Sequence, residues 1–147
     1  MKKIDFHIHT IPSVRDAHFV FSMDTLTSYV LERKLDAIAI TNHDLFDIAQ
    51  FSQIAEILEV PVFPGIEINM QSGHLLVIDD INRLEEFQEK ADKIRAIVKK
   101  VEDYVTFDKL IEIYGDLGEY LVIPHYQKKP AISGDELNWI LPYAFAG

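Results

Sequence analysis

Cysteine is absent from this sequence of 147 residues, and its absence narrows the chemistry available to the chain. Disulfide bonds are excluded, and so are metal sites built on thiolates. Any metal ion must therefore be bound through nitrogen and oxygen atoms of histidine, aspartate or glutamate. The lack of cysteine also agrees with a cytoplasmic location, where disulfides are rare, and we expect that location.

Long apolar runs and an excess of positive charge are also missing. No stretch approaches the roughly 18 apolar residues of a membrane span, so we expect no membrane partner. The segment 1–5 leads directly into a predicted strand, and we expect no secretory signal. The 24 acidic residues outnumber the 14 lysines and arginines, and the net charge of −10 argues against a broad nucleic-acid surface. A small phosphorylated substrate stays compatible, because bound cations reverse the field locally.

Strand and helix patterns alternate along the chain, which indicates an α/β fold in one domain, residues 1–147. The predicted strands cover 3–10, 36–41, 61–69, 74–79 and 120–125. The predicted helices cover 25–34, 48–58, 82–100 and 106–115, and Ser-Gly-Asp-Glu at 133–136 fits a capping box that opens a last helix. The connection between the third and fourth strands is too short for a helical crossover, so these strands should form an antiparallel hairpin.

The first predicted strand carries an unusual set of polar side chains in the segment Asp-Phe-His-Ile-His-Thr. Side chains alternate between the two faces of a strand, so Asp5, His7 and His9 share one face. A single buried histidine is usually a satisfied core residue. Two imidazoles at i and i+2, in line with a carboxylate, favour a metal site more strongly.

Further histidines and carboxylates accompany the other predicted strands. His43 and Asp44 directly follow the second strand, Glu67 interrupts the apolar third strand, His74 opens the fourth, and His125 ends the fifth. The tight turn brings His74 back to the end where Glu67 lies. Nearly all of these residues thus meet at the C-terminal strand ends, the edge where α/β folds bind ligands.

Some candidates also have a simpler interpretation. His18 fits an ordinary loop histidine, Asp44 fits the N-cap of the second helix, and His125 fits a polar strand end. The joint pattern still predicts a metal site. Its ligands suit Mn, Fe or Zn, and their number suits two or three ions. Clustered divalent ions bind phosphate oxygens and lower the pKa of bound water, which is the chemistry of phosphoester hydrolysis.

Five motifs, in order, resemble those of the PHP (polymerase and histidinol phosphatase) family of metal-dependent phosphoesterases. They are DFHIHT at 5–10, AITNHD at 39–44, PGIEIN at 64–69, HLLVI at 74–78 and IPH at 123–125. The resemblance implies a distorted βα barrel of seven strands, with up to three divalent ions at its C-terminal strand ends. It implies that Glu67 bridges two ions, and that Glu67 and His43 act in catalysis. By position, the implied metal ligands are His7, His9, His43, Glu67, His74 and His125.

The chain departs from the family pattern behind its first strand. The family usually has an acidic residue or histidine five or six places after the second histidine, where Val14 and Arg15 stand here. Asp16 is the nearest substitute ligand and His18 the next. The second motif has Asn42 where an aspartate is usual. Weaker candidates for binding metal or substrate complete the set: Asp5, His18, Asn42 and Asp44.

The closing Asp-x-His motif of the family has no counterpart in the final segment PYAFAG at 142–147. We therefore expect an incomplete barrel that holds fewer than three ions and forms the N-terminal portion of a longer protein. Similar modules precede ATPases and bacterial replicative polymerases, so a C-terminal ATPase-type domain is one implied partner. Missing barrel strands would expose an apolar edge, which predicts self-association.

Three functions compete at this point. The leading one is a metal-dependent phosphoesterase that acts on a phosphorylated small molecule, such as a nucleotide, or on a nucleic-acid end. The second is a structural or regulatory module of low activity inside a larger ATPase or polymerase-type protein. The third is an amidohydrolase-type metal hydrolase, which shares the opening His-x-His; the lack of a lysine in the candidate metal segments disfavours it.

Overall fold

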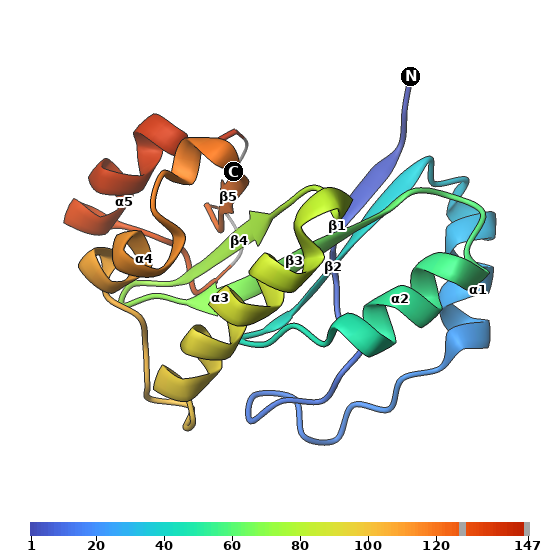
Figure 1. Ribbon diagram of the computed structural model, residues 1–147, viewed down its shortest axis with the longest axis horizontal. Helices are drawn as coiled ribbons and strands as arrows, with labels where there is room; N and C mark the ends of the chain where they lie inside the picture. The colour runs from blue at the N-terminus through green and yellow to red at the C-terminus, as the bar shows by residue number, and fades with distance from the viewer. Residues whose placement is uncertain (127–128, 146–147) are drawn as a thin grey trace.

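A curled five-stranded sheet forms the centre of the computed structural model, which describes residues 1–126 and 129–145 (Figure 1). Its strands lie in chain order: β1 (Ile4–Ile8), β2 (Ala37–His43), β3 (Val62–Asn69), β4 (His74–Ile78) and β5 (Leu121–Pro124). The first three strands are parallel, whereas β4 is antiparallel to both β3 and β5. The α/β class and the β3–β4 hairpin are thus confirmed. The described residues supply a half-barrel of five strands.

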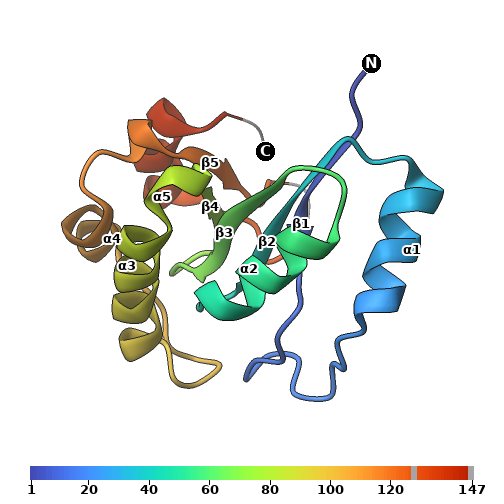
Figure 2. The same ribbon diagram turned by 45° about the vertical axis from the view of Figure 1, so that its right-hand side comes forward.

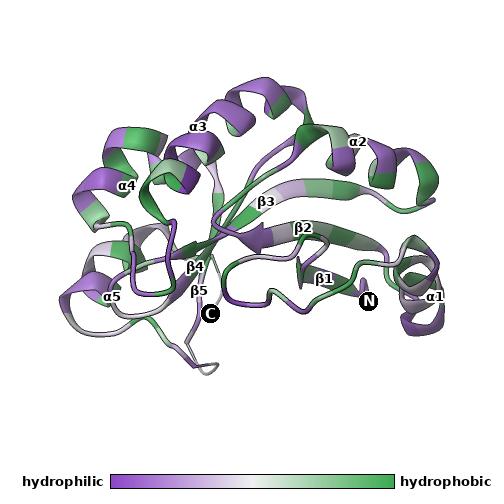
Figure 3. Cartoon of the chain, turned by 90° about the horizontal axis from the view of Figure 1, so that it is seen from below, coloured by the Kyte–Doolittle hydropathy of each residue, from purple (hydrophilic) through white to green (hydrophobic). Residues whose placement is uncertain are grey.

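Five α-helices surround this sheet: α1 (Met23–Arg33), α2 (Ile48–Ile57), α3 (Leu84–Ile97), α4 (Phe107–Tyr114) and α5 (Gly134–Ile140). Helices α2 and α3 lie across one face of the sheet, as Figure 3 shows from below. Figure 2 shows α1 beyond the β1 edge, with α4 and α5 near β5. None of the helices in the described ranges is both long and apolar enough to cross a membrane.

The main core lies between the sheet and α2 and α3. One face of β2, β3 and β4 contributes buried aliphatic side chains, and the helices add Phe51, Phe87 and Ile94. These strand residues are Ile38, Ile40, Ile66, Ile68, Leu75 and Val77. Their alternation leaves the other strand face free to carry Glu67 and the histidines. Burial of this apolar face thus fixes which side of the sheet the polar residues occupy.

Local capping explains where several helices begin. The sequence offers Ser22 or Asp24 as the N-cap of α1, and the hydroxyl of Ser22 accepts a hydrogen bond from the Thr25 N–H. Thr106 caps α4 in the same way, and α4 ends at Gly115 with a positive φ of 74°. Helix α2 is capped by Asp47, so the interpretation of Asp44 as its N-cap is wrong.

The predicted capping box at 133–136 is also wrong. Ser133 precedes α5, but its side chain caps no N–H of the helix among the described residues. Glu136 is buried and turns away from the helix start, to accept hydrogen bonds from the backbone of Gln71 and Ser72. A buried carboxylate needs such donors, and the β3–β4 turn supplies them.

The long helix predicted over 82–100 is shorter than expected. A 3₁₀ turn covers Ile81–Arg83, and α3 ends at Ile97. The backbone N–H groups of Lys99 and Lys100 then donate to the carboxylate of Asp103, each at 3.0 Å. This carboxylate offers the backbone an alternative to further helical turns.

The β3–β4 turn is pressed against the segment before α5. The backbone N–H of His74 donates to the Pro130 carbonyl, and that of Ile132 donates to the His125 carbonyl. A Cβ on Gly73 would lie 2.5 Å from the carbonyl carbon of Ala131, well inside any real contact distance. Only glycine fits this close backbone approach.

Candidate metal centre

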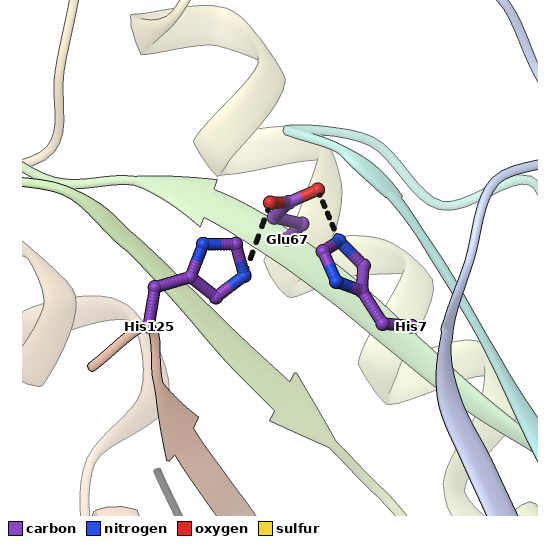
Figure 4. Close-up of side chains that lie close together, drawn as sticks. All are labelled: His7, Glu67 and His125. Atoms are coloured by element: carbon purple, nitrogen blue, oxygen red, sulfur yellow. Dashed lines mark hydrogen bonds and ion pairs between the residues drawn. The ribbon is translucent and has the colours of Figure 1, made fainter. Parts of the chain in front are cut away.

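Five imidazole rings converge on the carboxylate of one buried glutamate, Glu67, which is 1% exposed. They come from β1, the residue after it, β2, β4 and the residue after β5: His7, His9, His43, His74 and His125. Figure 4 shows two of them, His7 and His125, on either side of the glutamate. The sequence-based set of ligands thus forms one cluster on the concave side of the sheet.

One carboxylate oxygen meets three of these rings. The Oε2 atom of Glu67 lies 2.9 Å from His7 Nε2, 2.6 Å from His9 Nε2 and 3.3 Å from His43 Nδ1. His43 and Glu67 are register partners on the parallel strands β2 and β3, which accounts for their proximity. The register of β1 against β2 shifts between Asp5 and Ile8, and both His7 and His9, just after the strand, reach the same oxygen.

The other oxygen, Oε1, meets the two remaining rings. His74 Nδ1 lies 2.9 Å and His125 Nε2 lies 3.3 Å from it. The backbone N–H of His125 donates to the carbonyl of His74 at 2.9 Å, which holds these two histidines side by side. The hairpin therefore brings His74 to the same end of the sheet as Glu67, as its tight turn predicts.

Two groups of side chains have the spacing of metal ligands. His7, Glu67 and His125 form one group, and His9, His43 and Glu67 form the other; within each group the ligand atoms lie within 4.8 Å of one another. Glu67 belongs to both, as expected of a residue that bridges two ions. His74 lies outside both groups and contacts Glu67 directly.

Electrostatics favour the protonation states that metal ligands need. Burial acts to raise the pKa of Glu67, but hydrogen bonds from His7, His74 and His9 outweigh it and hold that pKa well below its usual range. Burial also lowers the pKa of His43 to about 4. At neutral pH the glutamate is therefore ionised and His43 is neutral, and both forms can bind a cation.

The donor set fits divalent metal ions. Two buried ring nitrogens, His43 Nδ1 and His74 Nε2, make no hydrogen bond within the described residues. Buried polar atoms are normally satisfied, so these atoms have capacity for a further partner. Five imidazoles also exceed the roughly four lone-pair sites of one carboxylate. Nitrogen and carboxylate ligands without thiolate suit Mn, Fe or Zn.

The sequence profile of the PHP domain family matches residues 5–143. The chain belongs to the PHP domain family. A search of curated proteins gives no significant match. Among solved structures, the chain is similar to a protein from Bifidobacterium adolescentis that bears the provisional name metal-dependent phosphoesterase. The two are 13% identical with a TM-score of 0.59, and the alignment covers 99% of this chain and 76% of the other.

Asp16, the substitute ligand predicted for this PHP domain, lies beside the cluster. Its Oδ2 atom is 3.5 Å from His9 Nδ1, while its Oδ1 accepts from the N–H of Ser13 at 2.7 Å. Burial acts to raise the pKa of Asp16, but its hydrogen bonds with Ser13 outweigh burial and lower the pKa. Asp16 belongs to neither ligand group. A carboxylate on the second nitrogen of a ligating histidine fixes the ring and makes it more basic.

The four weaker candidates of the PHP domain lie outside both ligand groups. Asp5 accepts a hydrogen bond from the Tyr29 hydroxyl at 2.6 Å, and His18 is exposed in the loop after β1. Asn42 is buried, and its Oδ1 accepts from the backbone of residues 10 and 11. Asp44 accepts from the Asn69 N–H, and burial raises its pKa to about 6. These contacts position the loops that surround the centre.

Sequence reasoning missed the residues that support the cluster. Ser13 binds Asp16, and Gln50 of α2 binds both the side chain and the carbonyl of Thr10. The spacing Ser-x-x-Asp at 13–16 carries a local signal for the first of these contacts. The contact between Gln50 and Thr10 spans 40 residues and leaves no trace in the local pattern.

Proposed function

We propose that this PHP domain is a divalent-metal-dependent phosphoesterase acting on a phosphorylated small molecule, such as a nucleotide, or on a nucleic-acid end. The observation that carries the proposal is the place of Glu67 in two ligand groups at once. Two ions about 3.5–4 Å apart clamp the attacking and leaving oxygens in many phosphatases and nucleases. A bridging carboxylate between two sets of imidazoles is suited to such a pair.

The side chains of the centre have different roles in this proposal. Glu67, His7 and His125 would hold one ion, and Glu67, His9 and His43 the other. Bound divalent ions would neutralise charge on phosphate oxygens and lower the pKa of a coordinated water. His74 donates to Glu67 through Nδ1 and so holds the carboxylate in place, and Asp16 orients His9.

Metal removal and a substrate panel test this proposal. The protein is stripped with a chelator, reloaded with Mn, Fe or Zn, and assayed on phosphomonoester, phosphodiester and amide substrates. We expect hydrolysis of a phosphoester that is lost on chelation and restored by metal. Glu67→Gln keeps the shape but removes the shared charge, so activity should fall at least 100-fold, on the scale of losses seen for residues that fix a metal centre.

A matched variant controls for the change of charge. Glu56→Gln alters an exposed carboxylate on α2 and should leave metal content and turnover unchanged. Hydrolysis that survives chelation would contradict the proposal, and so would turnover restricted to the amide substrate, which is the outcome of the amidohydrolase alternative.

One observation favours a non-enzymatic module as the second candidate. The described residues form five of the seven strands that the family resemblance implies, so part of the barrel wall around the centre is not formed by them. A structural or regulatory domain would bind metal without hydrolysing any ester. Full metal content combined with no turnover across the panel would favour this alternative.

A further inference from the structure

A cavity of about 780 Å³ lies beside the metal centre, between the loop after β1 and helix α3. The loop contributes Ser13 and Val14 to its lining, the end of β2 contributes His43, and the C-terminal half of α3 with the residues after it contributes Arg95 and Lys99. The volume lies within the range of small-molecule sites, about 300–1,000 Å³. Through His43 the cavity borders one of the two ligand groups.

A second cavity of about 370 Å³ adjoins the first and shares three lining residues with it: Pro12, Leu45 and Arg95. Arg95 therefore stands where the two cavities meet. At the loop wall, Arg15 Nη2 donates to the carbonyl of Val101 at 2.7 Å, which ties this loop to the segment after α3. This hydrogen bond holds the loop after β1 next to the segment after α3, beside the larger cavity.

The carboxylates that line the larger cavity have hydrogen-bond partners, whereas its cations form no ion pairs within the described residues. Asp44 accepts from the Asn69 N–H at 2.7 Å, and Asp92 accepts from the Gln88 side chain at 2.8 Å. Neither Arg95 nor Lys99 forms an ion pair with any residue in 1–126 or 129–145. In the lining, Arg95 and Lys99 balance the charges of Asp44 and Asp92, and because no carboxylate of the described residues holds them, both side chains are available to an anion in the cavity.

We propose that this cavity binds phosphoester substrates that carry a second phosphate, and that Arg95 and Lys99 recognise that phosphate. The inference rests on the proposed function, since it places the reacting phosphate at the metal centre near His43. The second phosphate then lies along the cavity, where a guanidinium forms paired hydrogen bonds to its oxygens and an ammonium adds a compact charge. A substrate with one phosphate reaches the metal centre but not these two side chains.

Kinetics on a matched pair of substrates test the proposal. The substrates are thymidine 5′-monophosphate and the dinucleotide pTpT, which adds one internal phosphate. The double variant Arg95→Gln/Lys99→Gln removes both charges and keeps the side-chain length. We expect its KM for pTpT to rise about tenfold or more, the scale set by lost hydrogen bonds between charged groups. Its KM for the monophosphate, its kcat and its metal content should stay at the wild-type values.

The control removes the same charge from the same stretch of chain. Lys93→Gln/Lys100→Gln changes two exposed lysines that line neither cavity, and its KM for pTpT should match the wild type. Equal KM values for pTpT in the wild type and in Arg95→Gln/Lys99→Gln would overturn the inference. A loss that is the same for both substrates would overturn it as well, because it would show no role for the second phosphate.

A binding measurement separates this inference from the proposed function. If no ester is hydrolysed, the proposed function fails, and anisotropy of 3′-fluorescein-labelled pTpT is measured on the manganese-loaded protein. Weaker binding by Arg95→Gln/Lys99→Gln than by the control variant would still support recognition of the second phosphate. Equal binding by both variants would refute it.

Discussion

At the scale of single residues, Glu67 organises the centre because five imidazoles share its two oxygens. Two of these imidazoles, His7 on β1 and His9 just after it, are partly exposed. Truncating them therefore leaves no large buried cavity. Their loss should affect metal binding far more than folding.

We predict that His7→Ala/His9→Ala lowers the metal content by at least one ion per chain, because the variant removes one nitrogen from each ligand group. Elemental analysis of the dialysed protein measures the change. His18→Ala is the control, since His18 is exposed and lies in neither group. A double variant that retains the full metal complement would show that the ligands lie elsewhere.

We predict that Asp16 raises the metal affinity of the centre without binding an ion itself. In Asp16→Asn the amide oxygen can still accept from Ser13, but the charge beside His9 Nδ1 is lost. We expect the metal affinity to fall about tenfold, at the lower end of the range for groups that orient metal ligands. Competition with a chelating dye measures this change. Asp108→Asn, on the exposed face of α4, is the control and should not change the metal affinity. Equal metal affinity in the two variants would show that Asp16 does not support the metal site.

The residues of the centre could be predicted from the sequence because each lies on a strand or directly after one, and most of them are near the strand end. Strand alternation and the meeting of C-terminal ends at one edge bring such residues together whatever the loops do. Arg95 and Lys99 could not be found this way, because α3 is separated from the metal motifs in the chain and its charges resemble any solvated helix face. Their position depends on how α3 packs on the sheet.

At the scale of elements, strand positions and most helix starts could be predicted because their signals are local. Ser22 and Thr106 act as caps within three residues of their partners. Ser-Gly-Asp-Glu at 133–136 carries the same local signal, yet Glu136 binds the β3–β4 turn some 64 residues away. The two N–H groups of this turn compete successfully with the local cap for the buried carboxylate of Glu136.

The α5 contact gives a stability prediction. Glu136→Gln replaces one carboxylate oxygen with an amide donor that faces the N–H of Gln71 or Ser72, so it should reduce the free energy of unfolding by about 1–3 kcal/mol. Ser133→Ala should cost less than about 0.5 kcal/mol, since the cap it would remove is not formed. Urea denaturation of both variants measures the difference. Equal losses of unfolding free energy in the two variants would mean that Ser133 does cap α5.

At the scale of the whole molecule, the half-barrel provides the ligands from which we predict the number of bound ions. The described residues provide two ligand groups that share Glu67, and we predict two divalent ions per chain at saturation. Titration of the stripped protein with manganese, followed by elemental analysis, measures the stoichiometry. The double variant His9→Ala/His43→Ala should retain one ion through His7 and His125. Three tightly bound ions in the wild type would require ligands beyond these two groups.

The close packing of Gly73 limits which substitutions this sequence can tolerate. Its backbone lies against residues 130–132, and the same stretch is hydrogen-bonded to His74 and His125. Any side chain at position 73 would displace residues 130–132, whose backbone is hydrogen-bonded to both of these histidines. In a library of single substitutions selected for metal loading, we expect position 73 to tolerate replacement as poorly as position 67. Gly73, which has no ligand atom for a metal ion, would thus tolerate substitution as poorly as Glu67.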